Sequence, residues 1–375
     1  MTAVSPSTDP VKAWLAALLR DADPGPMPDE AVLLDTAGAE GVLALCYDRL
    51  RRSPAWTRYP ETLRAALTRH AYQEVAVEML RAAELRAVLE ALAQQDLPVL
   101  LLKGAALAYT LYPEPHLRSR CDTDLLLPSR DEAERAWRML QTLGYQRPNA
   151  ISGDLISHEL GCYKTAPGGL THALDVHWRL SNNALFAERC TFAELAAMGV
   201  PIPPLGPQAR SLGPVHTLLL ACIHRIGHLP DGSGNWLIWL YDIHRLAQCF
   251  TEEHWRQFTV LAEERGVCGP CLDGLSTAQA WLAMALPEAV LRRLRTGADR
   301  ERFDPGQARS RWRFEWLIFR TLPSTAARLR WLGQCLFPEA DYMRRKYDFR
   351  HPGWLPWFYG LRLFQGVAKR LRQGR

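Results

Sequence analysis

One abrupt change of pattern constrains the fold more than any other feature of the sequence. Residues 64–95 are rich in Ala, Leu, Glu and Arg and contain neither Gly nor Pro, which predicts a helix. At Leu97 the sequence changes to Leu-Pro-Val-Leu-Leu-Leu, a short run typical of a buried strand, and Lys103-Gly104 follows at once. The N-terminal quarter, from Val11 to about Gln95, is therefore predicted to be all-α, and the sheet to begin near Leu97.

The centre of the chain alternates strands with helices. A strand is predicted over 121–127, followed by a helix over 131–143 for which Ser129 is a suitable N-cap. Two further strands, near 160–164 and over 170–178, flank a Pro-Gly-Gly turn and predict a hairpin. After a Pro-rich loop at 201–207, helical periodicity returns at Val215 and persists almost to the end. These changes predict four parts: an N-terminal helical region (1–95), an α/β core (96–200), a C-terminal helical domain (201–350) and a basic amphipathic tail (351–375).

Composition limits the class of protein. The chain has 375 residues, 48% of them hydrophobic and 23% charged, as expected for a globular protein of two or three domains. A net charge of +5 does not by itself indicate a nucleic-acid partner. Nine cysteines without a repeated spacing predict reduced thiols and a cytoplasmic location. We expect no stable membrane insertion, because no run is apolar and long enough for a leader or a span.

The C-terminal tail has a distinct character. From Trp354 to Arg375 it carries five basic residues and no acidic residue, interleaved with aromatic residues and leucines. Such a segment either lies on a membrane surface or a phosphate backbone, or docks by its apolar face as a terminal helix.

Two acidic residues lie two positions apart on the second predicted strand. Because side chains alternate along a strand, Asp122 and Asp124 are expected on one face, and Thr123 and Leu125 on the other. Two close carboxylates repel each other, so a divalent cation is a natural neutraliser, and Mg²⁺ prefers such oxygens together with phosphate oxygens and water. An isolated Asp-x-Asp pair also occurs at loop edges without any metal.

The order of the elements strengthens the metal interpretation. Lys103-Gly104 opens a predicted helix, and free N–H groups at a helix N-terminus bind phosphate. The Asp-x-Asp strand follows, and a later strand carries Asp175. These features predict the two halves of a site for a nucleoside triphosphate (NTP) and its metal ion.

The motifs also follow one another in a specific order. They are Leu-Lys-Gly-Ala-Ala-Leu (102–107), Leu-Arg (117–118), Asp-Thr-Asp-Leu-Leu-Leu (122–127), Gly-Tyr (144–145) and Leu-Asp-Val-His-Trp (174–178), and then the helical segments 218–224 and 239–246. In this order they resemble the uncharacterised bacterial nucleotidyltransferase family of the polymerase-β-like superfold, from Leu80 to about Tyr347. The resemblance implies an α+β fold in which a small mixed-sheet core is flanked by N-terminal and C-terminal helical regions.

The resemblance also implies roles for individual residues. It implies transfer of a nucleotidyl group from an NTP such as ATP, with Mg²⁺ or Mn²⁺, to an acceptor that could be a small molecule, a peptide, a protein or RNA. Asp122, Asp124 and Asp175 would be the catalytic and metal-binding residues, and Asp175 is also a candidate general base. The residues that would contact the nucleotide are Lys103, Gly104, Ala105, Arg118, His224 and Asp242.

Histidines near these motifs have two interpretations each. His177 shares a strand face with Asp175, where it either orients that carboxylate or is a half-buried ring bonded to the backbone. His224 and His228 lie one helical turn apart, a spacing that suits zinc, but the Glu of a His-Glu-x-x-His site is absent.

Three other functions compete with nucleotidyl transfer. Metal-dependent glycosyltransferases also use Asp-x-Asp, but here only one strand precedes the motif. A catalytically degenerate nucleotide-binding protein would keep the fold without turnover. Cys268-Gly269-Pro270-Cys271 matches a redox motif, but the pattern predicts a helix that ends at Gly266 and an interhelix turn over 267–271.

Overall fold

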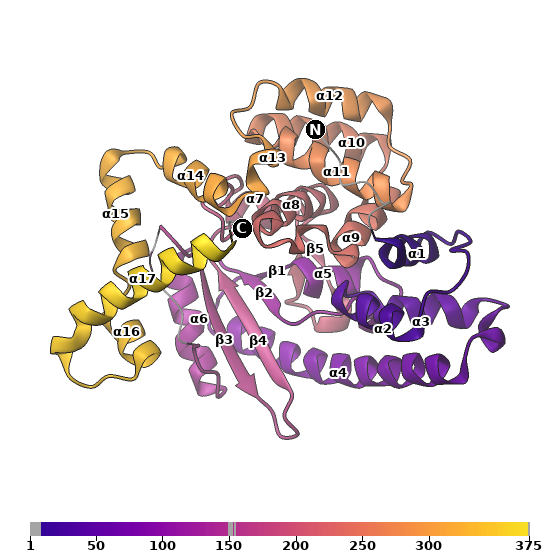
Figure 1. Ribbon diagram of the computed structural model, residues 1–375, viewed down its shortest axis with the longest axis horizontal. Helices are drawn as coiled ribbons and strands as arrows, with labels where there is room; N and C mark the ends of the chain where they lie inside the picture. Colours follow the sequence, from indigo (N-terminus) through magenta and orange to yellow (C-terminus); the bar gives the residue numbers. More distant parts are fainter. Residues whose placement is uncertain (1–8, 149–152, 154, 374–375) are drawn as a thin grey trace.

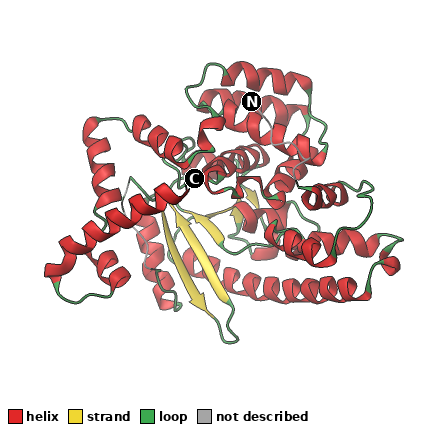
Figure 2. Cartoon of the chain, viewed as in Figure 1, coloured by secondary structure: helices red, strands yellow, loops and turns green. Residues whose placement is uncertain are grey.

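The computed structural model describes residues 9–148, 153 and 155–373. It confirms the predicted α+β class: a six-stranded mixed sheet lies among helices from both ends of the chain (Figures 1 and 2). The strands are β1 (Leu100–Leu102), β2 (Thr123–Leu126), β3 (Glu159–Thr165), β4 (Thr171–His177), β5 (Val200–Pro201) and β6 (Arg210–Ser211). The helices are α1 (Pro10–Leu19), α2 (Glu30–Ala39), α3 (Leu43–Arg52), α4 (Glu61–Ala93), α5 (Lys103–Thr110), α6 (Arg130–Thr142), α7 (Phe192–Ala197), α8 (Pro214–Gly227), α9 (Leu237–Gln248), α10 (Glu252–Arg265), α11 (Cys268–Leu282), α12 (Glu288–Ala298), α13 (Pro305–Ala308), α14 (Arg311–Thr321), α15 (Thr325–Leu336), α16 (Ala340–Tyr347) and α17 (Leu355–Gln373).

The sheet order is β3-β4-β2-β1-β6-β5. The predicted hairpin is confirmed as β3 and β4, which pair antiparallel from Glu159 opposite His177 to Thr165 opposite Thr171. β2 pairs parallel with β4 and antiparallel with β1. The strands β5 and β6, which lie on either side of the predicted Pro-rich loop at 201–207, were not predicted, because two-residue strands are too short to give an alternating pattern.

The two faces of the sheet belong to different hydrophobic clusters. Leu101, Leu125 and Val176 pack with α4 and α6 on one face, and the cap of α6 is Ser129, as predicted. Leu100 and Leu102 face the opposite way, into a larger cluster that includes α8 to α11. The helices α1 to α3 contribute to that same larger cluster, so the two ends of the chain share one core. The four-part domain division stays a prediction.

The Cys-Gly-Pro-Cys segment is placed differently from the prediction. The helix before it ends at Gly266, which has φ +61° as a C-cap should, but Cys268 already begins α11. The predicted turn over 267–271 is therefore wrong, because Pro270 is tolerated in the first turn of a helix. Both thiols are buried, and burial together with Glu301 raises the pKa of Cys268 to about 12. A thiol with this pKa stays protonated, which argues against redox chemistry.

In the described ranges, none of the helices combines the length and the apolar character that a membrane crossing requires.

Candidate active site

The chain passes from β1 into α5 without a connecting loop. Lys103, the first helical residue, has φ +49°, a conformation that costs a residue other than glycine free energy and that recurs at functional sites. Its ammonium group donates a hydrogen bond to Asp124 Oδ1 over 2.5 Å. The sharp turn thus aims the lysine across the sheet at the acidic residue of β2.

Asp124 is buried and bonded from two sides. His177 Nε2 lies 2.8 Å from the same Oδ1 atom, and the parallel pairing of β2 with β4 sets Asp124 directly beside Asp175. Burial alone would raise the pKa of Asp124, but the Lys103 charge and the His177 contact outweigh burial and hold this pKa far below its usual value. Asp124 therefore stays ionised at any physiological pH.

Asp175 is affected in the opposite direction. Burial, the charge of Glu159 and the charge of Asp124 together raise the pKa of Asp175 to about 7. Glu159 begins β3 opposite His177, and its Oε2 lies 3.3 Å from His177 Nδ1. Glu159 was not predicted as a site residue, although the hairpin register, once known, places it at this edge of the sheet.

The third predicted acid lies just before its strand. Because β2 begins at Thr123, Asp122 belongs to the preceding loop and is exposed, so the predicted strand 121–127 is too long at that end. The loop is tied to α4: Arg120 pairs with Glu78 over 2.6 Å, and Ser119 donates a hydrogen bond to Glu74. Although water reaches the Asp122 side chain, the surrounding protein partly desolvates its carboxyl, and this desolvation together with the charge of Asp124 raises the pKa of Asp122.

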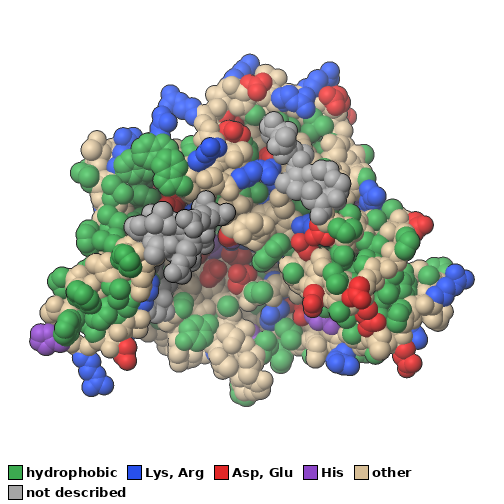
Figure 3. Space-filling view, viewed as in Figure 1, with side chains coloured by type: hydrophobic (Ala, Val, Ile, Leu, Met, Phe, Trp, Pro, Cys, Tyr) green, Lys and Arg blue, Asp and Glu red, His purple; other side chains and the backbone are tan. Residues whose placement is uncertain are grey.

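A cleft of about 850 Å³ opens over these residues. Figure 3 shows acidic side chains deep in a hollow in the middle of the face. The acids that line the cleft are Asp122, Asp124, Asp175, Glu159 and Asp231. Of the residues predicted to contact the nucleotide, Lys103, Gly104, Arg118 and His224 line it too. The side chain of Ala105 is buried in α5, so this residue could contact a nucleotide only through its backbone N–H at the start of the helix.

Arg118 and Asp242 bind each other. The Arg118 guanidinium donates to both carboxylate oxygens of Asp242, with the shortest contact at 2.7 Å, and Tyr112 donates to Oδ1 over the same distance. Both partners are at least nine-tenths buried. Asp242 lies behind the cleft wall, where it joins α9 to the loop before β2.

Aromatic and imidazole rings form part of the cleft wall. His224 of α8 lies 4.8 Å from Trp239 of α9 between ring centres, and His228 lies 4.7 Å from His224. Burial and the nearby charge of Lys103 lower the pKa of His224 well below its usual value, so the ring is neutral. Trp236 packs on Trp239 and is 40% exposed. The two histidines thus lie against tryptophan rings, and the wall they form is uncharged.

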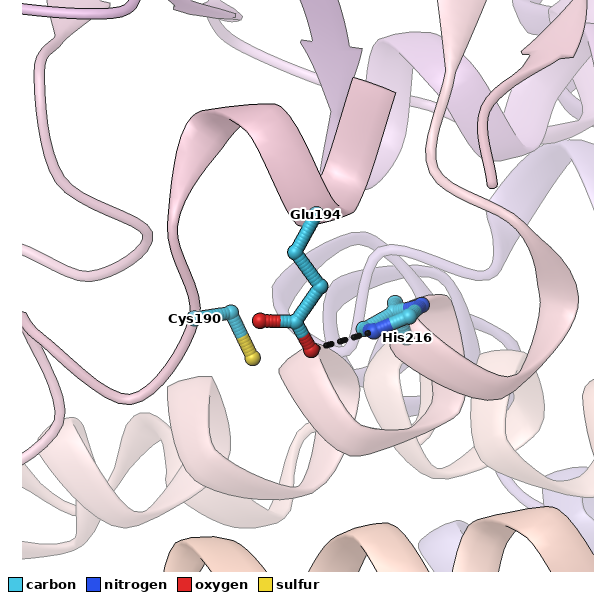
Figure 4. Close-up of side chains that lie close together, drawn as sticks. All are labelled: Cys190, Glu194 and His216. Carbon is cyan, nitrogen blue, oxygen red and sulfur yellow. Dashed lines mark hydrogen bonds and ion pairs between the residues drawn. The ribbon is translucent and has the colours of Figure 1, made fainter. Parts of the chain in front are cut away.

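Two groups of side chains in the described ranges could hold a metal ion. One is Asp124, Asp175 and His177, whose ligand atoms lie within 4.8 Å of one another. The other is Cys190, Glu194 and His216 (Figure 4). In the second group Arg265 already occupies Glu194 at 2.8 Å, and burial together with Glu194 raises the pKa of Cys190 to about 12. In the first group Asp124 is paired with Lys103 as well, but Asp122 and Glu159 add further negative charge at the cleft, which makes this group the better cation site.

We expect Asp175→Asn to stabilise the metal-free protein at pH 8. The folded protein keeps the Asp175 proton up to about pH 7, whereas an unfolded aspartic acid loses it near pH 4, so ionisation opposes folding above that pH. The gain in unfolding free energy should be about 2–4 kcal/mol at pH 8 and smaller at pH 5. Urea unfolding in EDTA measures it, with exposed Asp35→Asn as control. An unfolding free energy of Asp175→Asn equal to that of the wild type at pH 8 would contradict the claim that neighbouring acids raise the pKa of Asp175.

Fold and site together define a class: an α+β protein whose sheet carries a group of carboxylates, with a histidine, that could hold a metal ion beside a deep cleft. The family follows from comparison with known sequences. A model of the family described as uncharacterised nucleotidyltransferase matches residues 26–283, and the chain belongs to this family. The match begins before Leu80 and ends well before Tyr347, the limits predicted from the motifs. Among curated proteins the comparison found no match.

Proposed function

We propose that the protein transfers a nucleotidyl group from an NTP such as ATP to an acceptor hydroxyl, with Mg²⁺ or Mn²⁺ bound by Asp122, Asp124 and Asp175. The observation that carries this proposal is the convergence of these acids and Lys103 at one cleft. The cleft volume of about 850 Å³ suits a ligand of nucleotide size. Membership of a nucleotidyltransferase family supports the reaction class. A cytoplasmic location remains part of the proposal.

The donor set fits a divalent cation. The hydrogen bonds from Lys103 and His177 both end on Asp124 Oδ1, which leaves Oδ2 for a cation. The charge of Asp124 raises the pKa of Lys103 in spite of burial, so the site favours a positive charge. Burial and the negative charges of Glu159 and Asp124 raise the pKa of Asp175, and a cation would neutralise those charges. When bound, the ions would neutralise the triphosphate and make the acceptor hydroxyl more acidic.

The side chains of the chain itself supply the remaining chemistry. Asp175, which lines the cleft beside Asp124, would accept the proton of the acceptor hydroxyl. The acceptor oxygen forms a bond to the α-phosphorus, the bond from that phosphorus to the bridging oxygen breaks, and pyrophosphate leaves. Lys103 would move from Asp124 to the leaving phosphates, and the N–H groups of Gly104 and Ala105 in the first turn of α5 would donate hydrogen bonds to them.

Other residues position the substrate. The neutral ring of His224 lies at 73° to the ring of Trp239, and the two rings offer an uncharged aromatic wall for the nucleobase. Arg118 acts through its pair with Asp242: it fixes the loop that carries Asp122 relative to α9. In this proposal Arg118 and Asp242 are positioning residues, and of the two cations predicted to contact the nucleotide, Lys103 and Arg118, only Lys103 contacts the phosphates.

Calorimetric titration tests the proposal. Each NTP, with Mg²⁺ and without it, is titrated into the wild type and into the double variant Asp122→Asn/Asp124→Asn, whose fold is checked by circular dichroism. We expect binding that needs the metal and weakens at least about 100-fold in the folded variant, because a charged ligand pair loses about 3 kcal/mol or more with its cation. Equal affinity with and without Mg²⁺, or in both proteins, would rule out the metal-dependent site.

A further inference from the structure

The charges are distributed very unevenly along the chain. Residues 309–375 contain 15 of the 45 Lys and Arg residues but only four of the 40 Asp and Glu residues. The preceding residues therefore carry more acids than bases. The same segment contains 14 of the 35 Phe, Trp and Tyr residues. The mild net charge of the whole protein thus conceals a strongly basic and aromatic segment, which lies beyond the family match.

This segment folds into an arm of helices. We call α14, α15, α16 and α17 as far as Gln365 the C-terminal arm. Figure 1 shows the arm beside the rest of the molecule, with α17 running back toward the centre of the view. The helix α15 has no buried residue and α14 has one, Phe314. Figure 3 shows hydrophobic side chains spread over this part of the surface.

Four rings of the arm form what we call the aromatic ladder: Trp312, Trp316, Phe319 and Trp331. The rings of Trp312 and Trp316 are 6.3 Å apart and nearly parallel, at 6°. Phe319 stacks on Trp316 at 5.5 Å, and Trp331 of α15 lies 6.0 Å from Phe319. Trp312 is 68% exposed and Trp316 is 48% exposed, so apolar ring surface faces solvent. Isolated domains seldom leave so much aromatic area uncovered without a ligand.

Basic side chains flank the ladder. The Arg328 guanidinium lies 5.9 Å from the Phe319 ring centre in a cation–π contact. Arg313 and Arg320 of α14 are exposed and lie three positions before and four positions after Trp316 in the same helix. Flat rings with guanidinium groups beside them match a chain of stacked bases joined by phosphates, since the rings receive the bases and the cations receive the phosphates.

The helices that carry the ladder adjoin the rim of the cleft. The helix α14 packs against the short helical turn Leu229–Asp231, and Asp231 lines the cleft. From α15, Gln334 accepts a hydrogen bond from the backbone N–H of Leu155, four residues before Glu159. The arm is therefore joined to two segments that lead into the cleft.

We propose that the C-terminal arm binds single-stranded RNA and presents its terminal hydroxyl to the cleft. The second half of this statement rests on the proposed nucleotidyl transfer: the hydroxyl loses its proton, its oxygen bonds to the α-phosphorus of the NTP, and pyrophosphate leaves. Binding itself does not depend on catalysis. The charge of the arm and the stacking geometry of the ladder select a polyanion that carries flat bases.

Fluorescence anisotropy of a labelled 20-nucleotide RNA tests the proposal with the full chain. We expect Trp312→Ala/Trp316→Ala to weaken binding at least about tenfold, because each lost stack is worth about 1–3 kcal/mol. The matched control is Tyr72→Ala, which removes an equally exposed ring from α4. Wild-type affinity should fall steeply with salt. An unchanged affinity in the double variant, or no RNA binding by the wild type, overturns the proposal.

Two further measurements separate the alternatives. Asp122→Asn/Asp124→Asn should bind RNA as the wild type does, so a failure of NTP binding leaves the arm proposal standing. Sedimentation with phosphatidylglycerol vesicles tests a lipid surface instead. Vesicle binding that needs Trp312 and Trp316, in a protein that does not bind RNA, would show that the arm is a membrane-docking surface and would overturn the RNA assignment.

Discussion

Asp124→Asn is expected to reduce nucleotidyl transfer by on the order of 10³-fold or more, because it removes a ligand that orients the metal and several kcal/mol of transition-state stabilisation. Asp124 is the point at which Lys103, His177 and the neighbouring Asp175 meet, so no other side chain can replace its charge. Pyrophosphate release from the NTP identified by calorimetry, with water or an added hydroxyl compound as acceptor, measures the loss.

The control for this experiment is Asp35→Asn, an exposed carboxylate of α2 outside the cleft, which should retain full activity. Asp175→Asn should lose activity and gain stability at the same time. A wild type that binds NTP and metal but releases no pyrophosphate would contradict the enzymatic part of the account. It would favour the catalytically degenerate nucleotide-binding protein instead.

Asp242→Asn is expected to destabilise the fold by about 3–5 kcal/mol, because it leaves the buried guanidinium of Arg118 without its counter-charge. Urea unfolding monitored by tryptophan fluorescence measures this loss. The double variant Arg118→Met/Asp242→Leu removes both charges and should be more stable than Asp242→Asn. The exposed pair Arg256–Glu253 is the control, and Glu253→Gln should cost less than about 1 kcal/mol.

If Asp242→Asn lowers the unfolding free energy as little as Glu253→Gln does, the Arg118–Asp242 pair does not stabilise the contact between α9 and the loop before β2. Asp242 would then be available for the nucleotide contact predicted from the sequence.

Much of the sheet could be predicted, because its signals are local. The apolar run at Leu97, the Pro-Gly-Gly turn and the N-cap at Ser129 each act within a few residues, and β1, the β3–β4 hairpin and α6 appear where they were expected. Strand alternation pointed to Asp124 together with Asp122, although Asp122 lies just before β2. Asp175 followed from the order of the elements and from the family resemblance. The shortest strands, β5 and β6, were not predicted, because two residues are too few to show the alternation of a strand.

The parts of the site that were missed depend on contacts far apart in sequence. Glu159 reaches the site only through the register that sets it opposite His177. The Arg118–Asp242 pair spans 124 positions, and no spacing rule reports such a contact. The left-handed conformation of Lys103 is similarly invisible, since a lysine there goes against local preference and persists only because the surrounding structure holds it.

Diffraction from crystals grown with Mn²⁺ and a non-hydrolysable NTP tests the central claim most directly, because anomalous scattering locates Mn²⁺ without reference to any assumed role. We expect Mn²⁺ about 2 Å from carboxylate oxygens of Asp122, Asp124 and Asp175, with the triphosphate beside Lys103. Manganese bound only at Cys190, Glu194 and His216, or a nucleotide bound away from the three acids, would contradict the account.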